Sequence, residues 1–143
     1  MRLVYTAGTF DLLHLGHVRI IRAAQGFGDK VIVAVSTDEL VEQYKGRRPV
    51  VPFDERLEMV RALRGVDAVV AQHDQDKFAA WQRIKFDVWL VGDDWFGTPQ
   101  YEGYRTQLEA VGVHCAFVPY TAGVSSTSRK ADAGAASVGP ARG

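Results

Sequence analysis

The chain has 143 residues and a mass of 15.8 kDa, which fits one compact domain and excludes two domains of ordinary size. With 47% hydrophobic and 24% charged residues it has globular composition, and a chain of this length buries enough apolar surface to fold without disulfides. Seventeen basic residues balance seventeen acidic ones, so no overall charge draws the protein to nucleic acid or to a membrane surface. Any phosphate site must therefore be a local cluster.

The cysteine content and the hydropathy pattern indicate the cellular compartment in which the protein is expected. The single cysteine, Cys115, excludes a disulfide or a four-cysteine zinc site within one chain and fits a reducing cytoplasm. The N-terminus lacks the pattern of a signal peptide, and no stretch approaches about 18 apolar residues. We therefore expect a cytoplasmic protein that has neither a membrane nor a nucleic acid as its partner.

Predicted strands and helices alternate along the chain. The apolar run at 3–7 and the β-branched run at 30–36 are typical of buried strands, and a helical spacing of apolar residues lies between them at about 17–25. The alternation continues, in chain order, as helix 54–63, strand 68–71, helix 77–83, strand 87–91, helix 101–111 and strand 114–118. This pattern predicts an α/β fold with a single Rossmann-like, doubly wound parallel sheet.

The last part of the chain differs from the rest in composition. Hydroxyl side chains at residues 125–127 can cap a final short helix. Residues 131–143 offer no large apolar side chain that could anchor them. We therefore expect one domain over residues 1–130 and a disordered tail over residues 131–143.

The densest chemical signal lies between the first strand and the first helix, where the chain reads GTFDLLHLGH from Gly8 to His17. Backbone N–H groups at a helix start attract phosphate, and Gly8 and Gly16 allow a close approach of the backbone. His14 and His17 are three residues apart, so both can face one anion. The alternative is that the histidines are unrelated, with one capping the helix and the other exposed.

The motif His14-Leu15-Gly16-His17, with Gly8-Thr9-Phe10-Asp11 before it, resembles the H-x-G-H signature of the nucleotidyltransferase superfamily. Residues 34–39, 91–95 and 123–127 resemble further blocks of that superfamily in the expected order. Within it, the Gly-Asp-Asp-Trp sequence that starts at residue 92 is similar to the glycerol-3-phosphate cytidylyltransferase family. The resemblance covers about the first 130 residues. It implies transfer of a cytidylyl group from CTP to glycerol 3-phosphate by direct in-line attack, which gives CDP-glycerol and pyrophosphate.

The resemblance also implies a role for each matched residue. His14, His17 and Lys45 are expected to be catalytic, because their donors and charge can stabilise the triphosphate and the reacting phosphorus. Lys77 and Arg56 are expected to contact the acceptor. The other matched residues are expected to bind the nucleotide: Gly8, Thr9, Phe10, Gly16, Asp94, Trp95, Gly123, Val124, Ser125, Ser126 and Thr127.

Some of these assignments have a chemical rationale of their own and a simpler alternative. The Asp94 carboxylate can accept a hydrogen bond from an exocyclic amino group such as that of cytosine. The hydroxyls at 125–127 can hold phosphates at a helix start. Alternatively, Asp93 and Asp94 cap a turn or bind Mg²⁺, and the hydroxyls only cap a helix. A solvated surface position is the alternative for Arg47, Arg48 and Lys77.

The resemblance further implies the binding partners, which are CTP and a small phosphate-bearing acceptor. It implies Mg²⁺ on the triphosphate, no metal held by protein side chains, a homodimer, and a supply of CDP-glycerol for teichoic-acid-like polymers. The family reads RTEGISTT where this chain reads YTAGVSST from Tyr120, so an arginine and a glutamate are absent. Two alternatives therefore stand beside the main hypothesis. One is a nucleotidyltransferase of this fold that uses ATP or another acceptor, such as phosphoethanolamine or a sugar phosphate, and the other is an inactive nucleotide-binding subunit.

Overall fold

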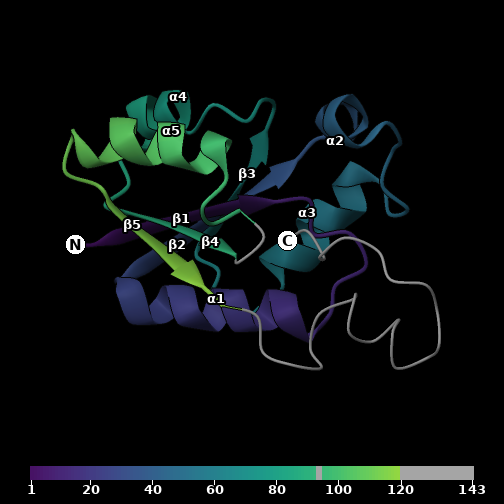
Figure 1. The fold of residues 1–143 in the computed structure, drawn as a ribbon. Coiled ribbons are helices and arrows are strands. Elements are labelled where there is room, and N and C mark those ends of the chain that lie inside the picture. The colour runs from purple at the N-terminus through teal and green to yellow at the C-terminus, as the bar shows by residue number, and fades with distance from the viewer. Residues whose placement is uncertain (93–94, 120–143) are drawn as a thin grey trace.

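The computed structural model describes residues 1–92 and 95–119. In this part of the chain the elements follow in the order β1 (Leu3–Gly8), α1 (Leu15–Phe27), β2 (Lys30–Ser36), α2 (Asp38–Lys45), α3 (Phe53–Arg61), β3 (Ala68–Gln72), α4 (Lys77–Ile84), β4 (Val88–Gly92), α5 (Pro99–Glu109) and β5 (His114–Val118) (Figure 1). None of the described helices is both long and apolar enough to cross a bilayer.

Five parallel strands form one sheet within the described residues, in the order β3-β2-β1-β4-β5. β1 and β2 pair in a register that places Leu3 opposite Lys30 and Gly8 opposite Val35. Strand order changes direction between β1 and β4, so the carboxyl ends of these two strands flank a topological switch point. This topology confirms the predicted Rossmann-like sheet and identifies the edge where such sheets bind ligands.

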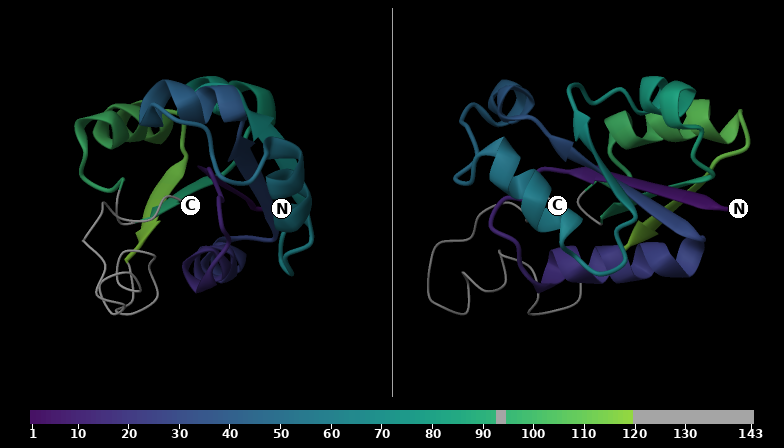
Figure 2. Two further views of the ribbon diagram at one scale, coloured as in Figure 1. Left: turned by 90° about the vertical axis from the view of Figure 1, so that its right-hand side faces the viewer. Right: turned by 180° about the vertical axis from the view of Figure 1, so that it is seen from behind.

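Helices cover both faces of the sheet, with α1 and α3 on one face and α4 and α5 on the other (Figures 1 and 2). The two-residue period of β4 shows how the sequence produces these layers. Val88 and Leu90 are buried in the cluster with α1 and α3, whereas Trp89 and Val91 are buried in the cluster with α4 and α5. Trp89 is completely buried and stacks on Tyr101 of α5 with ring centroids 5.2 Å apart.

Helix α2 is absent from the helices that the sequence predicted. The helix starts at a cap in which Thr37 Oγ1 accepts a hydrogen bond from Leu40 N at 3.1 Å. It ends at Gly46, whose φ of 77° lies in the left-handed region that glycine adopts without steric cost. Only Leu40 and Val41 of this helix are buried, so no long apolar stripe reveals it in the sequence.

Two predicted helices begin two residues earlier than expected, and a capping side chain explains each. The helix predicted over 17–25 starts at Leu15, because His14 caps it. The helix predicted over 101–111 starts at Pro99, where Thr98 Oγ1 accepts a hydrogen bond from Tyr101 N at 3.1 Å.

Candidate active site

A pocket of about 380 Å³ opens at the switch point between β1 and β4. The connection from β1 to α1 and the first turns of α1 form one wall, and residues that lead into α4 and α5 form the opposite wall. The structure brings together seven of the sequence-predicted site residues around this pocket: Gly8, Phe10, His14, Gly16, His17, Lys77 and Trp95.

His14 and His17 form a reciprocal cap at the start of α1. His14 Nδ1 accepts a hydrogen bond from Gly16 N at 3.0 Å, and His17 Nδ1 accepts one from His14 N at 3.1 Å. A backbone N–H can only donate, so in this arrangement each neutral ring carries its proton on Nε2. The ring centroids are 4.1 Å apart, and the helix dipole adds positive potential at the same place.

The alternative of two unrelated histidines is therefore excluded. His14 does cap the helix, but His17 is only 3% exposed and lines the same pocket. Its ring also packs against Phe10, with centroids 5.3 Å apart. Both rings therefore belong to one pocket, where an Nε2–H group of each could donate to an anion.

The connection that leads to the histidines is strained and clamped. Phe10 and Leu12 have positive φ angles of 55° and 53°, a conformation that costs a side-chain-bearing residue on the order of 1–3 kcal/mol. Between them, the Asp11 carboxylate accepts hydrogen bonds from Val50 N at 2.8 Å and Val51 N at 2.9 Å. Asp11 thus ties the β1–α1 connection to the loop that follows α2.

Arg56, which was expected to contact the acceptor, does not line the pocket. Its side chain is 0% exposed and donates from Nε to Val51 O at 2.8 Å. Nη1 donates to Thr9 O at 2.7 Å and to Ser36 O at 2.8 Å, and Nη2 donates to Asp38 Oδ1 at 2.7 Å. The structure therefore places this guanidinium outside the described pocket lining, where it joins the β1–α1 connection, the end of β2, the start of α2 and the segment before α3.

Thr9 and Lys45 lie near the pocket without lining it, and Tyr44 connects them to it. Thr9 is 1% exposed, and its Oγ1 lies 2.6 Å from the Tyr44 hydroxyl. Lys45 is exposed at the end of α2, with Nζ 5.9 Å from the centroid of the Tyr44 ring. Tyr44 itself lines the pocket, although the sequence reasoning did not select it.

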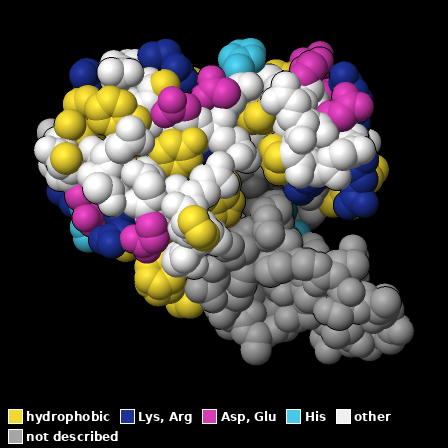
Figure 3. Space-filling model, turned by 45° about the horizontal axis from the view of Figure 1, so that its top comes forward, with side chains coloured by type: hydrophobic (Ala, Val, Ile, Leu, Met, Phe, Trp, Pro, Cys, Tyr) yellow, Lys and Arg dark blue, Asp and Glu magenta, His cyan; other side chains and the backbone are white. Residues whose placement is uncertain are grey.

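The two arginines that follow Lys45 differ in their surroundings, because Arg48 lies near carboxylates whereas Arg47 is exposed to solvent. The Arg48 guanidinium lies 3.8, 3.6 and 3.4 Å from carboxylate oxygens of Asp38, Glu39 and Glu42. Arg47 is exposed and lies outside the pocket lining. For both arginines the placement agrees with the solvated alternative. Basic and acidic side chains are also interspersed on the face that Figure 3 shows.

Lys77 is the buried cation of the site. It is the first residue of α4, is 3% exposed and donates from Nζ to Gln75 O at 3.0 Å. Burial lowers the pKa of Lys77 to about 8, against the opposing effect of the carboxylates of Asp74 and Asp76. Nζ also lies 5.0 Å from the centroid of the Trp95 ring. These contacts exclude the solvated alternative for Lys77.

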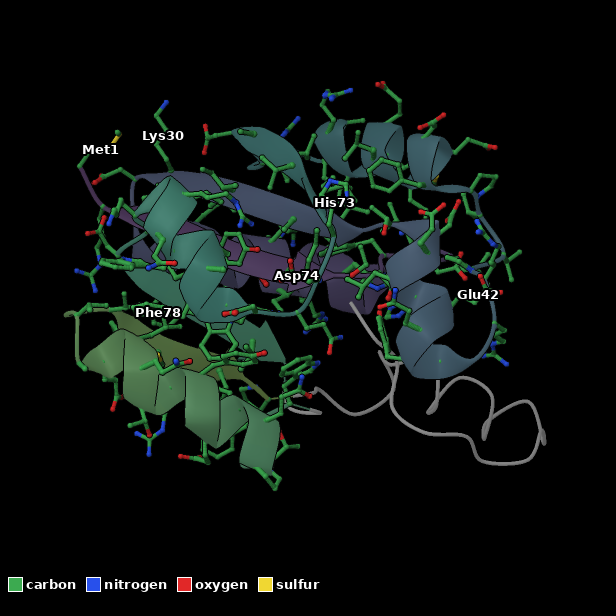
Figure 4. All side chains as sticks on the ribbon, turned by 90° about the horizontal axis from the view of Figure 1, so that it is seen from above. Met1, Lys30, Glu42, His73, Asp74 and Phe78 are labelled. Carbon is green, nitrogen blue, oxygen red and sulfur yellow. The ribbon has the colours of Figure 1, made fainter. Side chains whose placement is uncertain are left out.

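Seen from above, the loop that carries His73 and Asp74 lies between α2 on one side and the adjacent helices α4 and α5 on the other (Figure 4). This loop leads directly to Lys77, so its conformation decides where the buried ammonium group enters the pocket.

Sequence reasoning missed several polar residues that line the pocket. Ser36 and Gln72 are the last residues of β2 and β3, and Gln72 Nε2 donates to Ser36 Oγ at 2.9 Å. Their position at the carboxyl ends of adjacent strands is a signal that could have found them. No sequence pattern marks the others, which are Thr6, Arg19, Tyr44, Gln75, Thr98 and Gln100.

The remaining predicted nucleotide-binding residues, Asp94 and Gly123 to Thr127, lie outside the described residues, as do the departure at Tyr120 and the expected tail at 131–143. Within residues 1–92 and 95–119, no group of three or more His, Cys, Asp or Glu side chains could hold a metal ion.

Comparisons with known proteins agree with the fold. The chain is 34% identical over 137 residues to the glycerol-3-phosphate cytidylyltransferase of Bacillus subtilis, which covers 91% of this chain and 95% of that protein. It is 35% identical over 127 residues to the bifunctional protein HldE of Koribacter versatilis, but it spans only 26% of the length of that relative. A lipopolysaccharide core biosynthesis protein from Thermoplasma volcanium matches in structure with a TM-score of 0.70 and 26% identity, over 85% of this chain and 97% of that one.

The match to a protein family extends through nearly the whole sheet. Residues 5–131 match the family described as cytidylyltransferase-like, so the match includes the histidine motif, Lys77 and the strands that flank the pocket. With this match and the similarity to the Bacillus subtilis enzyme over most of both chains, the chain belongs to the cytidylyltransferase-like family.

Proposed function

We propose that the protein transfers a cytidylyl group from CTP to glycerol 3-phosphate, giving CDP-glycerol and pyrophosphate. The observation that carries this proposal is a single pocket with His14 and His17 on one wall and the buried cation Lys77 on the other. Two phosphate-bearing substrates repel each other, so the reaction between them needs hydrogen-bond donors or cations beside each of the two anions. Similarity to the Bacillus subtilis enzyme over most of both chains supports the choice of acceptor.

The histidine wall suits the triphosphate. His14 and His17 line the pocket at the amino-terminal end of α1, and backbone hydrogen bonds to Nδ1 fix the orientation of both rings. Fixed donors need no reorientation when negative charge builds up on the departing pyrophosphate, which is the condition for stabilising a transition state. His14 and His17 would therefore be catalytic residues that contact the triphosphate.

The Lys77 wall suits the acceptor phosphate. An oxygen of this phosphate attacks the α-phosphorus of CTP, a new P–O bond forms, and the bond to the bridging oxygen of pyrophosphate breaks. The acceptor is already a nucleophile, so no residue needs to form a covalent intermediate. Lys77 holds the acceptor in line and offsets its charge, since an ammonium group is well suited to phosphate.

CTP would enter the reaction as its Mg²⁺ complex, in which the triphosphate oxygens hold the ion. The charged and polar groups of the described pocket lining are histidine, lysine, arginine, amide and hydroxyl side chains, so in this proposal the triphosphate supplies the ligands of the ion. Mg²⁺ prefers carboxylate and phosphate oxygens, and the triphosphate supplies the latter. The metal would add to the neutralisation of the leaving pyrophosphate.

A pyrophosphate-release assay with glycerol 3-phosphate and each of CTP, ATP, GTP and UTP tests the proposal. Release with CTP in clear preference to the other nucleotides, and its loss in His17→Ala, would support both the base and the reaction. Release only with ATP would overturn the choice of base. If no nucleotide supports release although CTP binds, the proposed activity is wrong, and either glycerol 3-phosphate is not the acceptor or the chain is a nucleotide-binding subunit.

A second candidate is the same chemistry with a different nucleotide or acceptor. The 35% identity to the HldE protein of Koribacter versatilis favours it, because that similarity also includes 88% of this chain. Repeating the assay with sugar phosphates and phosphoethanolamine separates the two candidates. A higher kcat/KM with one of these acceptors than with glycerol 3-phosphate would favour the second.

A further inference from the structure

The wall of the pocket that carries Lys77 also carries a linked pair of amide side chains. The backbone carbonyl of Gln75 accepts the hydrogen bond from Lys77 Nζ at 3.0 Å, and the side-chain oxygen of Gln75 accepts one from Gln100 Nε2 at 3.1 Å. Both glutamines line the pocket. This pair therefore links the loop before α4 to the first turn of α5, next to the buried ammonium group.

The ammonium group and the two amide side chains lie at different depths in the pocket. Lys77 is 3% exposed, whereas Gln75 is partly exposed and Gln100 is exposed. A ligand whose phosphate reaches Lys77 would extend outward past the two amides. The part of the acceptor that meets Gln75 and Gln100 is thus its carbon chain and not its reacting phosphate.

The charges along this wall disfavour an acceptor that carries a positive group, such as an amine, in addition to its phosphate. Among the described residues that line the pocket there is no aspartate or glutamate. Lys77 Nζ already lies 5.0 Å from the ring centroid of Trp95 and 5.8 Å from that of Tyr104, so these rings already have a cation beside them. The carboxylates of Asp74 and Asp76 act on Lys77 from outside this lining, so an acceptor amine would be repelled by Lys77 and would find no carboxylate among the described lining residues.

We propose that Gln75 and Gln100 are specificity-determining residues that recognise hydroxyl groups on the carbon chain of the acceptor, and that the pocket therefore selects hydroxylated phosphate monoesters. An amide offers both a donor and an acceptor, which is what a hydroxyl group needs for its two kinds of hydrogen bond. A site built to bind hydroxyls rejects analogues that lack them, because its polar groups are then left without partners. This inference rests on the proposed function.

The test compares three acceptors of the same length, namely glycerol 3-phosphate, propyl phosphate and 3-aminopropyl phosphate, in the CTP-dependent release of pyrophosphate. For the unmodified protein, we expect kcat/KM to fall by at least about tenfold from glycerol 3-phosphate to propyl phosphate. It should fall further for 3-aminopropyl phosphate, which places an ammonium group near Lys77.

Variants then identify the residues responsible. Gln75→Leu and Gln100→Leu should each lower kcat/KM for glycerol 3-phosphate by about fivefold to tenfold and leave that for propyl phosphate nearly unchanged. Gln75→Glu should raise the activity with 3-aminopropyl phosphate relative to propyl phosphate, because it adds a counter-charge. Gln82→Leu, on an exposed position of α4 outside the pocket, is the matched control and should leave all three values unchanged.

The outcomes separate this inference from the proposed function. If the unmodified protein releases no pyrophosphate from CTP with any acceptor, the proposed function is wrong and the inference is wrong with it. If it uses glycerol 3-phosphate but the ratio between glycerol 3-phosphate and propyl phosphate is the same in both leucine variants as in the Gln82→Leu control, only the recognition of hydroxyls by the two glutamines is wrong. Circular dichroism of each variant confirms that it is folded.

Discussion

His17 Nδ1 accepts a hydrogen bond from the backbone N–H of His14 at 3.1 Å, so the helix cap that starts α1 also sets the orientation of a pocket side chain. The same atom cannot hold a proton while it accepts this bond, which leaves Nε2–H for the pocket. The three-residue spacing of the motif thus has a structural reason. The first histidine occupies the cap position and the second occupies the third position of the helix.

Two substitutions at His17 separate its capping role from its role in the pocket. In His17→Asn the side-chain oxygen can still accept from His14 N, but no donor reaches the position of Nε2. We expect the free energy of unfolding to change by less than about 1 kcal/mol and kcat to fall on the order of a hundredfold. Urea unfolding and pyrophosphate release measure the two effects.

His17→Gln is the complementary variant, because its amide oxygen can accept from His14 N, as glutamine does at the third position of a capping box, while its N–H₂ group can point toward the position of Nε2. It should retain more activity than His17→Asn, with a similar free energy of unfolding. Equal activity in the two variants would contradict a role for the Nε2–H donor.

The lowered pKa of Lys77 predicts a pH dependence of acceptor use. Burial places this pKa at about 8, so the ammonium group is lost as the pH rises through that value. KM for glycerol 3-phosphate should therefore rise above pH 8, while KM for CTP changes less. Lys77→Arg keeps its charge and should remove this rise between pH 7 and 9.5. A rise of the same size in Lys77→Arg would assign the titration to another group.

The same burial predicts how stability changes with pH. The unfolded lysine keeps its proton up to its ordinary pKa of 10.5, whereas the folded one releases it near pH 8. The penalty for burying the charge is therefore present below pH 8 and is relieved as the pH rises toward 10.5. Lys77→Met removes the penalty and should raise the free energy of unfolding at pH 7 more than at pH 10. A smaller increase at pH 7 than at pH 10 in urea unfolding would contradict this.

Arg56 provides a prediction that distinguishes a structural role from acceptor binding. Arg56→Met removes the donors to Thr9 O, Ser36 O and Val51 O and leaves Asp38 without its partner at 2.7 Å. We expect a loss of about 3 kcal/mol in the free energy of unfolding. Arg61→Met removes only an exposed ion pair to Glu58 and should cost less than about 0.5 kcal/mol. If both variants cost the same while Arg56→Met raises KM for the acceptor, the predicted acceptor contact would be correct after all.

Asp11 predicts a local effect on the loop after α2. Asp11→Asn leaves one carbonyl oxygen for the two N–H groups of Val50 and Val51, and its own N–H₂ group then faces a donor. Hydrogen exchange at these two amides should become at least about fivefold faster, while exchange at Val33 in the middle of β2 stays unchanged. Equal acceleration at Val33 would indicate global destabilisation instead of a released loop.

The alternation of apolar runs with helical patterns was sufficient to predict the sheet, because its inner strands are buried on both faces and therefore read as continuous apolar runs, as residues 30–36 do. The glycine-framed histidine pair was equally visible, since its residues are close in sequence. Helix α2 was not visible, because a helix with two buried residues produces no clear period. Its caps at Thr37 and Gly46 hold it in place, and these are single residues that occur as often in loops.

Placement of the cations depended on tertiary contacts that no local pattern contains. Arg56 and Lys77 both follow a turn at a helix start, and in the sequence they differ little. In the structure Arg56 donates to three backbone carbonyls, whereas Lys77 lines the pocket beside Trp95. The amide pair Gln75 and Gln100 joins residues 25 positions apart, so only the folded chain shows that they belong to one wall.

The most direct test of cytidylyl transfer follows the phosphorus atom that is transferred. The purified protein is incubated with CTP labelled at the α-phosphorus, Mg²⁺ and glycerol 3-phosphate, and the products are separated by chromatography. We predict that the label moves into CDP-glycerol, that unlabelled pyrophosphate forms in equal amount, and that His17→Asn slows both by the same factor. Label that stays in CTP or is released only as CMP would contradict the proposed transfer to the acceptor.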